Sequence, residues 1–321
     1  MKKLFPRRFI RRFEQQYLIK DRNLTGIIDF ETPLKKVAGG LQFTEGPVWE
    51  PQQELLFFSD IPGDTIYSIS GTDQTCRPYR SPSNHSNGLT LDKKSRLIVC
   101  EHGTRQVTRT EKNGVITVLC SHYRGKRLNS PNDVIVKSDG SIYFTDPSYG
   151  ITNDMQEQPV QGVYRYVPDE DSLTLIIADI KTPNGLAFTP DESLLYVDSS
   201  HPQEQVLFVF EVLPSGLVGK KERFFDFNTG AKGSPDGMKI DSSGNIYCTG
   251  PGGLWIFNQG GAHLGTIKLP EIPSNCAWGD TDRRTLFITA MSSVYSLRTK
   301  IEGLAAGGNK NYRGIQRKGQ K

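Results

Sequence analysis

A chain of 321 residues is long enough for one large all-β domain or for two domains of ordinary size, and it can bury a core without disulfides. Its 32 glycines and 19 prolines favour many short strands joined by turns over a bundle of helices. The net charge is only +4, and part of it lies in basic residues near the two ends, so the body of the chain lacks the basic stripe of a nucleic-acid-binding surface.

The first 24 residues form a basic extension that we expect to be helical. Aromatic residues recur here every four positions, which is the spacing of one face of a helix. They are Phe5, Phe9, Phe13 and Tyr17. Two interpretations remain open: a short helix that packs on the domain, or a basic amphipathic helix that contacts a membrane surface.

The five cysteines point to a reducing compartment. Their number is odd and none forms a C-x-x-C pair, so neither a disulfide framework nor a zinc site is predicted. Several lie in apolar runs and are expected to be small buried core residues. No apolar run approaches the roughly 18 residues of a membrane span. We therefore predict a cytoplasmic protein.

One unit recurs six times between residues 45 and 300, at spacings of 39–52 residues. Each copy begins with a polar residue, often followed by glycine, and continues as an apolar strand, a polar turn and a second apolar strand. Units of about 40–50 residues with several strands each are typical of propeller blades. The sequence thus predicts one all-β domain, a six-bladed β-propeller over residues 25–300. The basic C-terminal tail, residues 301–321, is expected to be disordered.

The residues that begin the six units are predicted to form a ring. In a propeller the first strand of each blade lines the central channel, so equivalent positions converge at one mouth. All six carry side-chain oxygens and none is basic. They are Glu45, Asn87, Asn132, Asn184, Asp236 and Asn275. Such oxygens suit one hard divalent cation, with calcium favoured and magnesium, manganese or zinc as alternatives.

A second interpretation of the asparagines is structural. Asn before Gly is a common turn signal, and Asn113-Gly114 is expected to be a simple hairpin turn. For any single asparagine of the ring this interpretation stays open. It explains six polar starts in register less well, because two of them are acidic. Asn87 and Asn275 are the least secure members of the ring.

Several segments carry a family resemblance. They are residues 45–49 (EGPVW), 127–134 (RLNSPNDV), 139–147 (DGSIYFTDP), 183–188 (PNGLAF) and 235–238 (PDGM). Together they resemble the gluconolactonase/senescence-marker-protein (regucalcin-like) family of calcium-dependent lactonases. The run Cys100-Glu101-His102-Gly103 is similar to the gluconolactonase branch in particular. The resemblance covers about residues 25–300.

The resemblance implies a six-bladed propeller with a divalent metal at the channel mouth. It implies Glu45, Asn184 and Asp236 as metal ligands and Asn132 as a ligand or substrate contact. Mammalian members carry an arginine where this chain has Ser130, so their substrate contacts do not transfer directly. The candidate substrate-binding residues are Asn132, His102, Arg127, Asn129 and Asp146.

The predicted reaction is metal-assisted hydrolysis of a sugar lactone, D-glucono-1,5-lactone to D-gluconate, which makes the chain a carboxylic ester hydrolase. The cation would polarise the carbonyl, and a carboxylate would accept a proton from the attacking water. Asp236 is the first candidate for this catalytic base. The alternatives are Asp146, Asp198 and His102. A small-molecule lactone is the expected partner, and no nucleic acid is expected.

Two rival functions use the same fold. A phosphotriesterase of the diisopropylfluorophosphatase type would share the metal ring, so only its substrates would distinguish it. A non-catalytic calcium-binding or interaction propeller would show an incomplete ring or exposed apolar patches. Other hydrolase and nucleotide-binding motifs, such as G-x-S-x-G, H-E-x-x-H and the Walker loop, are absent.

Overall fold

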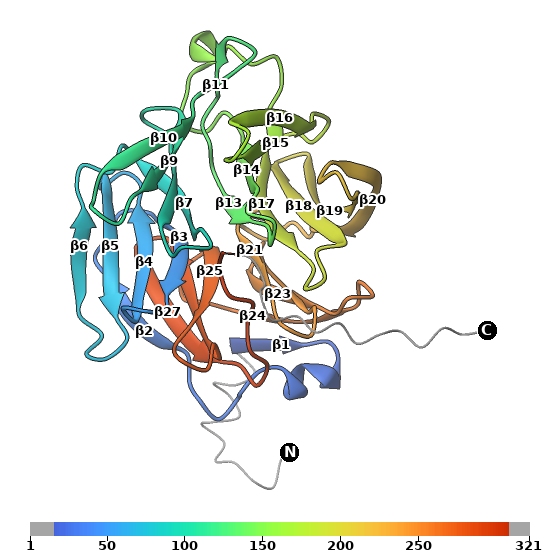
Figure 1. Ribbon diagram of the computed structural model, residues 1–321. Coiled ribbons are helices and arrows are strands. Elements are labelled where there is room, and N and C mark those ends of the chain that lie inside the picture. The colour runs from blue at the N-terminus through green and yellow to red at the C-terminus, as the bar shows by residue number, and fades with distance from the viewer. Residues whose placement is uncertain (1–15, 308–321) are drawn as a thin grey trace, which may run out of the picture.

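Six antiparallel sheets surround a central channel in the computed structural model, which describes residues 16–307 (Figure 1). This arrangement confirms the predicted all-β class and the six-bladed β-propeller. Two short 3₁₀ helices, η1 (Arg22–Gly26) and η2 (Asn153–Met155), lie in connecting segments. In the described part of the chain no helix is long and apolar enough to cross a membrane.

Four blades are built from four consecutive strands each, with the first strand beside the channel. Blade 1 contains β3 (Thr44–Glu50), β4 (Leu55–Asp60), β5 (Thr65–Ser70) and β6 (Cys76–Arg80). Blade 2 contains β7 (Ser86–Leu91), β8 (Leu97–Glu101), β9 (Gln106–Thr110) and β10 (Ile116–Cys120). Blade 3 contains β13 (Val134–Val136), β14 (Ile142–Asp146), β15 (Gly162–Val167) and β16 (Ser172–Ile177). Blade 4 contains β17 (Pro183–Phe188), β18 (Leu194–His201), β19 (Glu204–Val212) and β20 (Val218–Asp226).

The last two blades are completed by strands from the N-terminal side. Blade 5 contains β21 (Met238–Ile240), β22 (Ile246–Gly250), β23 (Gly253–Phe257) and β24 (His263–Ile267), with β1 (Tyr17–Ile19) on its outer edge. Blade 6 contains β25 (Pro273–Gly279), β26 (Thr285–Ala290), β27 (Ser293–Arg298) and, outermost, β2 (Lys35–Gly39). Since β2 precedes blade 1 in the chain, its pairing with β27 joins the first and last blades and closes the ring.

The predicted N-terminal helix is not observed in the described residues. Tyr17, the last aromatic residue of the expected helical stripe, lies in strand β1 and packs edge-on against Phe30, with ring centroids 4.8 Å apart. Phe5, Phe9 and Phe13 lie outside the described residues. A period of four is ambiguous, because residues four apart also share one side of a strand.

The segment after blade 6 returns to the channel. Leu304 donates its backbone N–H to Ile240 at 3.4 Å, and Gly303 donates its own to Arg283 at 2.8 Å. Residues 301–307 therefore pack on the propeller beyond the boundary expected at residue 300. The rest of the predicted C-terminal tail, residues 308–321, lies outside the described residues.

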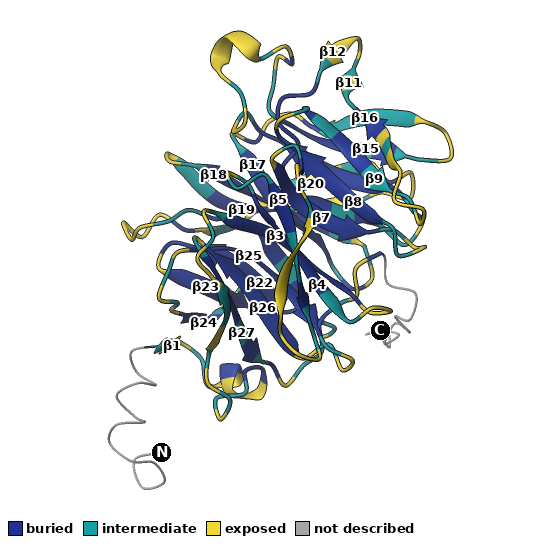
Figure 2. Cartoon of the chain, turned by 90° about the vertical axis from the view of Figure 1, so that its left-hand side faces the viewer, coloured by how far each residue is buried: buried dark blue, intermediate teal, exposed yellow. Residues whose placement is uncertain are grey.

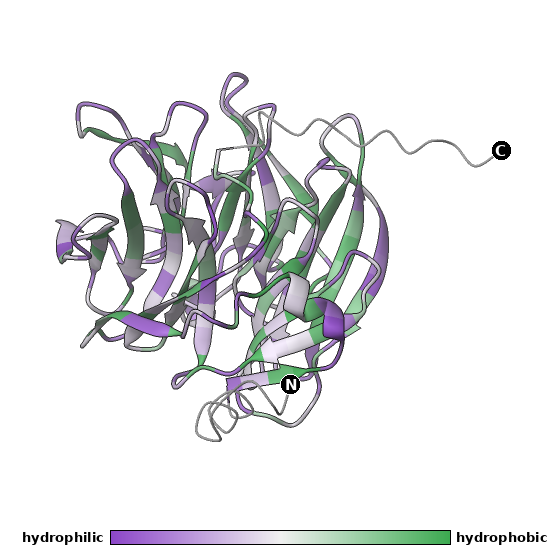
Figure 3. Cartoon of the chain, turned by 90° about the horizontal axis from the view of Figure 1, so that it is seen from below, coloured by the Kyte–Doolittle hydropathy of each residue, from purple (hydrophilic) through white to green (hydrophobic). Residues whose placement is uncertain are grey.

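The hydrophobic core lies between the blades rather than in the channel. One cluster joins Val163 of blade 3 to Leu186 and Val197 of blade 4, and other pairs of blades pack in the same way. Figure 2 shows the strands as mostly buried, and Figure 3 shows that hydrophilic residues gather in the loops. Because neighbouring sheets bury each other's apolar faces, the channel is left to the inner strands.

Glycines that follow the ring residues allow the inner strands to approach one another. The backbone N–H of Gly88 donates to the carbonyl of Asn132 at 2.7 Å. A Cβ atom at Gly88 would lie 2.3 Å from that same oxygen, closer than any side-chain carbon tolerates. Gly46 and Gly185 stand in the same relation to the next blade. These Gly residues therefore lie in strands, whereas Asn113-Gly114 forms the predicted hairpin turn between β9 and β10.

Replacing Gly88 with alanine tests this close approach. The new Cβ would collide with backbone atoms of blade 3, which cannot rotate away. We expect Gly88→Ala to lower the free energy of unfolding by about 1–3 kcal/mol in urea denaturation. Gly26→Ala is the matched control, because nothing lies within 4 Å of a Cβ there. Equal stability of the two variants would contradict the packing argument.

Candidate active site

The six ring residues lie at one mouth of the channel, at or just before the start of the inner strands. Asn87 Nδ2 donates to Asn132 Oδ1 at 2.6 Å, and Asn132 Nδ2 donates to Asn184 Oδ1 at 2.5 Å. On the other side of the mouth, Asn275 Nδ2 donates to Glu45 Oε2 at 3.0 Å. These bonds link side chains from blades 1, 2, 3, 4 and 6. The structure therefore brings the predicted ring together.

Glu45 is buried and only half satisfied. Its Oε2 accepts hydrogen bonds from Asn275 and from the backbone N–H of Gly46, whereas its Oε1 has no hydrogen-bond partner among the described residues. Burial, together with the negative charge of Asp133, raises the pKa of Glu45 to about 7. A buried carboxylate oxygen without a donor is unfavourable, and a bound cation would satisfy it.

Asp236 is the partly exposed acid of the ring. Loss of hydration raises its pKa well above the usual value, and the charges of Glu45, Asp198 and Asp133 raise it further. Asp198 is fully buried behind the mouth, where its carboxylate accepts the N–H of Gly185 at 3.3 Å. The negative charges therefore repel one another, and a divalent cation among them would reverse this repulsion.

The residues present fit a hard cation held by mixed ligands. Across residues 16–307, no group of three or more His, Cys, Asp or Glu side chains forms a metal site by itself. Carboxylates from Glu45 and Asp236 would therefore need amide oxygens to complete a coordination shell. Asn132 and Asn184 lie between them around the mouth, and such mixed oxygen sets are typical of calcium.

Asn87 and Asn275 position other members of the ring. The Oδ1 of Asn275 accepts hydrogen bonds from Lys239 Nζ at 3.2 Å and from the N–H of Cys276 at 2.8 Å, so it is already occupied. Asn87 Nδ2 lies 3.2 Å from His102 Nε2 while it donates to Asn132. Asn275 thus orients Glu45, to which its Nδ2 donates, and Asn87 orients Asn132.

Two hydroxyl groups that the sequence analysis missed lie beside Asn184. Its Nδ2 donates to Ser200 Oγ at 2.9 Å and lies 3.5 Å from the Oη of Tyr149. Tyr149 is half exposed and its pKa is raised by loss of hydration and by the Asp236 charge. Tyr149 follows the second strand of its repeat unit, β14, and Ser200 lies near the end of the second strand of the next unit, β18. Their place at the ring-mouth end of these strands was the signal available in the sequence.

His102 lies against the ring as a neutral side chain. It is 8% exposed, and burial lowers its pKa to about 4. Gly150 packs so close that a Cβ there would lie 2.8 Å from the Cβ of His102. His102 is therefore placed to offer a neutral imidazole at the mouth.

The remaining candidates for substrate binding lie elsewhere. Asp146 is fully buried and accepts the backbone N–H groups of Asn129 at 2.8 Å and Ser130 at 2.7 Å. The amide of Asn129 donates to the carbonyls of Asp146 and Val160. Both side chains brace the segment that leads to Asn132, and neither has an exposed atom for a ligand. Their role in substrate binding stays a prediction.

Arg127 belongs to a small hairpin that projects from the fold. Strand β12 (Lys126–Arg127) pairs with β11 (His122–Tyr123), and Figure 1 shows this hairpin away from the channel. The Nη2 of Arg127 donates to the carbonyl of Thr104 at 2.7 Å. Of the five predicted substrate-binding residues, the structure therefore places Asn132 and His102 at the ring.

Comparison with known proteins gives the family. The family model of the SMP-30/gluconolactonase/LRE-like region matches residues 43–292. The chain belongs to this family. A gluconolactonase of Zymomonas mobilis is 36% identical over 305 residues, which cover 87% of this chain and 85% of that protein. The predicted family is thus confirmed.

Solved structures of similar proteins share the family fold. A gluconolactonase from Xanthomonas campestris is 33% identical, with a TM-score of 0.82 over 88% of this chain and 94% of that one. Regucalcin from Agrobacterium tumefaciens, described as a calcium-binding protein, is 17% identical with a TM-score of 0.72 over 87% and 98% of the two chains. At that identity the likeness shows the fold alone.

The protonation of His102 is a direct test of this family member's site. Its pKa of about 4 lies below the ordinary value of 6.5, so the charged form is disfavoured in the folded protein. Stability associated with neutral His102 should be present above pH 6.5 and be lost as the pH falls toward 4. We expect NMR titration of ¹⁵N-labelled histidine to show no protonation of His102 down to about pH 5. The His102→Gln variant identifies the NMR signal of His102, because that signal is missing from its spectrum. A titration midpoint of His102 near the ordinary pKa of 6.5 would contradict the buried, neutral imidazole.

Proposed function

We propose that the chain is a metal-dependent lactonase, a carboxylic ester hydrolase that opens a sugar lactone such as D-glucono-1,5-lactone to the corresponding acid. Similar proteins at 36% and 33% identity are gluconolactonases. The observation that carries the proposal is the convergence of Glu45, Asn132, Asn184 and Asp236 from different blades on one mouth. This set includes a buried carboxylate oxygen, Oε1 of Glu45, that has no donor within residues 16–307.

One divalent cation is proposed at this mouth, with calcium as the first choice. The oxygens of Glu45, Asp236, Asn132 and Asn184 would hold it, and no histidine or cysteine belongs to the set. When bound, the cation would polarise the lactone carbonyl and stabilise the oxyanion that forms on it.

Asp236 is proposed as the base that accepts a proton from the attacking water. Among the acids near the mouth it is the one that is partly exposed, whereas Asp146 and Asp198 are fully buried. The water oxygen would attack the carbonyl carbon, and the ring C–O bond would then break to give a carboxylic acid and a hydroxyl group. The half-exposed hydroxyl of Tyr149 would orient the sugar.

We also propose a cytoplasmic location. All five cysteines are free, and four of them are buried in the propeller. Free thiols are the usual state in a reducing compartment.

A lactone assay with controlled metals tests the proposed function. Treatment with EDTA should abolish hydrolysis of D-glucono-1,5-lactone, and restoring calcium, magnesium, manganese or zinc one at a time should identify the metal. We expect Asp236→Asn to lower kcat by about 10²–10⁴-fold, because it loses a base and a ligand charge. Asp191→Asn is the control, since Asp191 belongs to the exposed β17–β18 turn. Activity that survives EDTA would contradict metal dependence.

Calcium should also stabilise the folded protein independently of activity. At one hundred times the dissociation constant, the expected gain is about 2.7 kcal/mol. In the metal-free protein, the raised pKa of Glu45 means that stability is lost as the pH rises from 4.5 to about 7. Calcium should recover it best above about pH 7, where protons no longer compete. Thermal unfolding with and without calcium measures the increase in melting temperature. An equal increase in the Glu45→Gln variant would contradict the role of Glu45 as a calcium ligand.

A further inference from the structure

Lys239 reaches into the channel beneath the ring. Its Nζ donates to Asn275 Oδ1 at 3.2 Å and to the carbonyl of Met238 at 3.0 Å, and it lies 4.0 Å from Asp133 Oδ2. Lys239 belongs to blade 5, Asn275 to blade 6 and Asp133 to the start of blade 3. A side chain that meets both of these blades has to extend across the channel.

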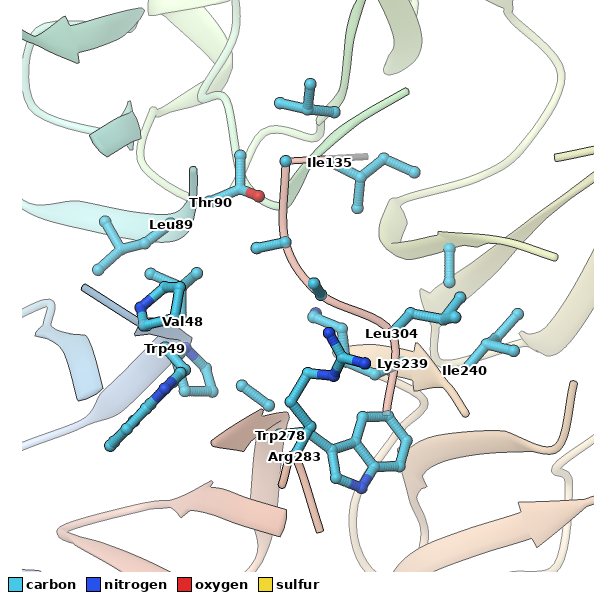
Figure 4. A pocket seen from close by; sticks show the side chains of 18 of the residues that line it. Val48, Trp49, Leu89, Thr90, Ile135, Lys239, Ile240, Trp278, Arg283 and Leu304 are labelled. Atoms are coloured by element: carbon cyan, nitrogen blue, oxygen red, sulfur yellow. The ribbon is translucent and has the colours of Figure 1, made fainter. Parts of the chain in front are cut away.

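Lys239 also lines a cavity on the other side. This cavity of about 370 Å³ lies at the opposite mouth, where the inner strands end and residues 304–307 cross the opening (Figure 4). Val48, Trp278 and Leu304 contribute apolar walls. Lys239 thus lies between an acidic mouth and a cavity that has apolar walls and also charged lining residues such as Arg283.

Asp133 is an extra acid at this level of the channel. In the other five units the position after the ring residue is glycine or cysteine, so only blade 3 adds a carboxylate there. Asp133 is buried, and its Oδ1 accepts the N–H of Val134 at 2.9 Å. Its Oδ2 has no hydrogen-bond partner among the described residues, and Lys239 is its ion-pair neighbour.

The acidic groups around the channel lie near the positively charged side chain of Lys239. Four carboxylates act on one another around the channel. They are Glu45, Asp133, Asp198 and Asp236. A divalent ion supplies two positive charges, and Lys239 supplies a third from the inner side, where its charge also lowers the pKa of Glu45.

We propose that Lys239 is a built-in cation that fills the inner end of the acidic channel and limits this channel to one divalent ion. This inference rests on the proposed cation site at the ring. The atoms around the ammonium group are a carbonyl, an amide and a carboxylate oxygen, which are the donors that calcium prefers. Without the ammonium group, the same atoms would attract calcium.

Calcium titration of the metal-stripped full chain by calorimetry tests the proposal. Wild type should bind one equivalent. Lys239→Met keeps the length of the side chain and removes its charge, and should either bind a second equivalent or bind the first at least about tenfold more tightly. Lys221→Met is the matched control with wild-type binding, because Lys221 has similar exposure, 27% against 23%, but pairs with Asp179 on an outer strand.

Removal of both charges should cancel the effect. The double variant Lys239→Met/Asp133→Asn should again bind one equivalent of calcium, with an affinity within about threefold of wild type. Lys239→Arg, which keeps the positive charge, should give the same result. If Lys239→Met does not fold alone, the proposal requires that calcium rescues its folding and that the double variant folds without calcium.

Two results overturn the inference and are distinguishable. A folded Lys239→Met with unchanged stoichiometry and affinity would show that Lys239 does not limit cation binding. Absence of calcium binding in wild type would instead contradict the ring site, and with it this role of Lys239.

Discussion

The close approach of six inner strands around one channel is the constraint on which the rest of the structure depends. At Gly88 and Gly237 the strands come near enough for backbone hydrogen bonds of 2.7 Å between neighbouring blades. This approach forces the polar side chains that begin each strand into one small mouth. Their charged forms lose hydration there, so the pKa values of Glu45 and Asp236 rise. The close approach of these carboxylates is unfavourable in the metal-free protein, and it favours the binding of a cation.

The channel has two different ends because its lining changes along the inner strands. At the ring mouth, amide and carboxylate groups bond to one another from blade to blade. At the opposite mouth, the ends of the same strands contribute apolar side chains, and residues 304–307 cross between them. Lys239 marks the boundary, because it lines the cavity while its ammonium group lies near Asn275 and Asp133. This arrangement keeps the cation-binding chemistry at one face of the propeller.

A raised pKa does not by itself identify a catalytic acid in this fold. Burial raises the pKa of Asp146 to about 7, yet both carboxylate oxygens accept backbone N–H groups and hold the segment before Asn132 in place. Asp198 is equally buried behind the ring. Asp236 differs from both because solvent reaches it at the mouth. Exposure and hydrogen-bond partners, rather than acidity alone, separate the proposed base from its structural neighbours.

The sequence by itself determined the six blades and the residues of the ring. Each blade repeats a local pattern, and Glu45, Asn132, Asn184 and Asp236 occupy the same place in that pattern, so their convergence follows from the fold. Only the tertiary structure decided the closing strand β2, the hydroxyls of Tyr149 and Ser200, the bracing role of Asp146 and the position of Lys239. These features depend on contacts between residues far apart in the chain. Nothing in the sequence around a lysine in a short strand indicates which non-adjacent blade its charge will meet, because only the closed ring brings the two together.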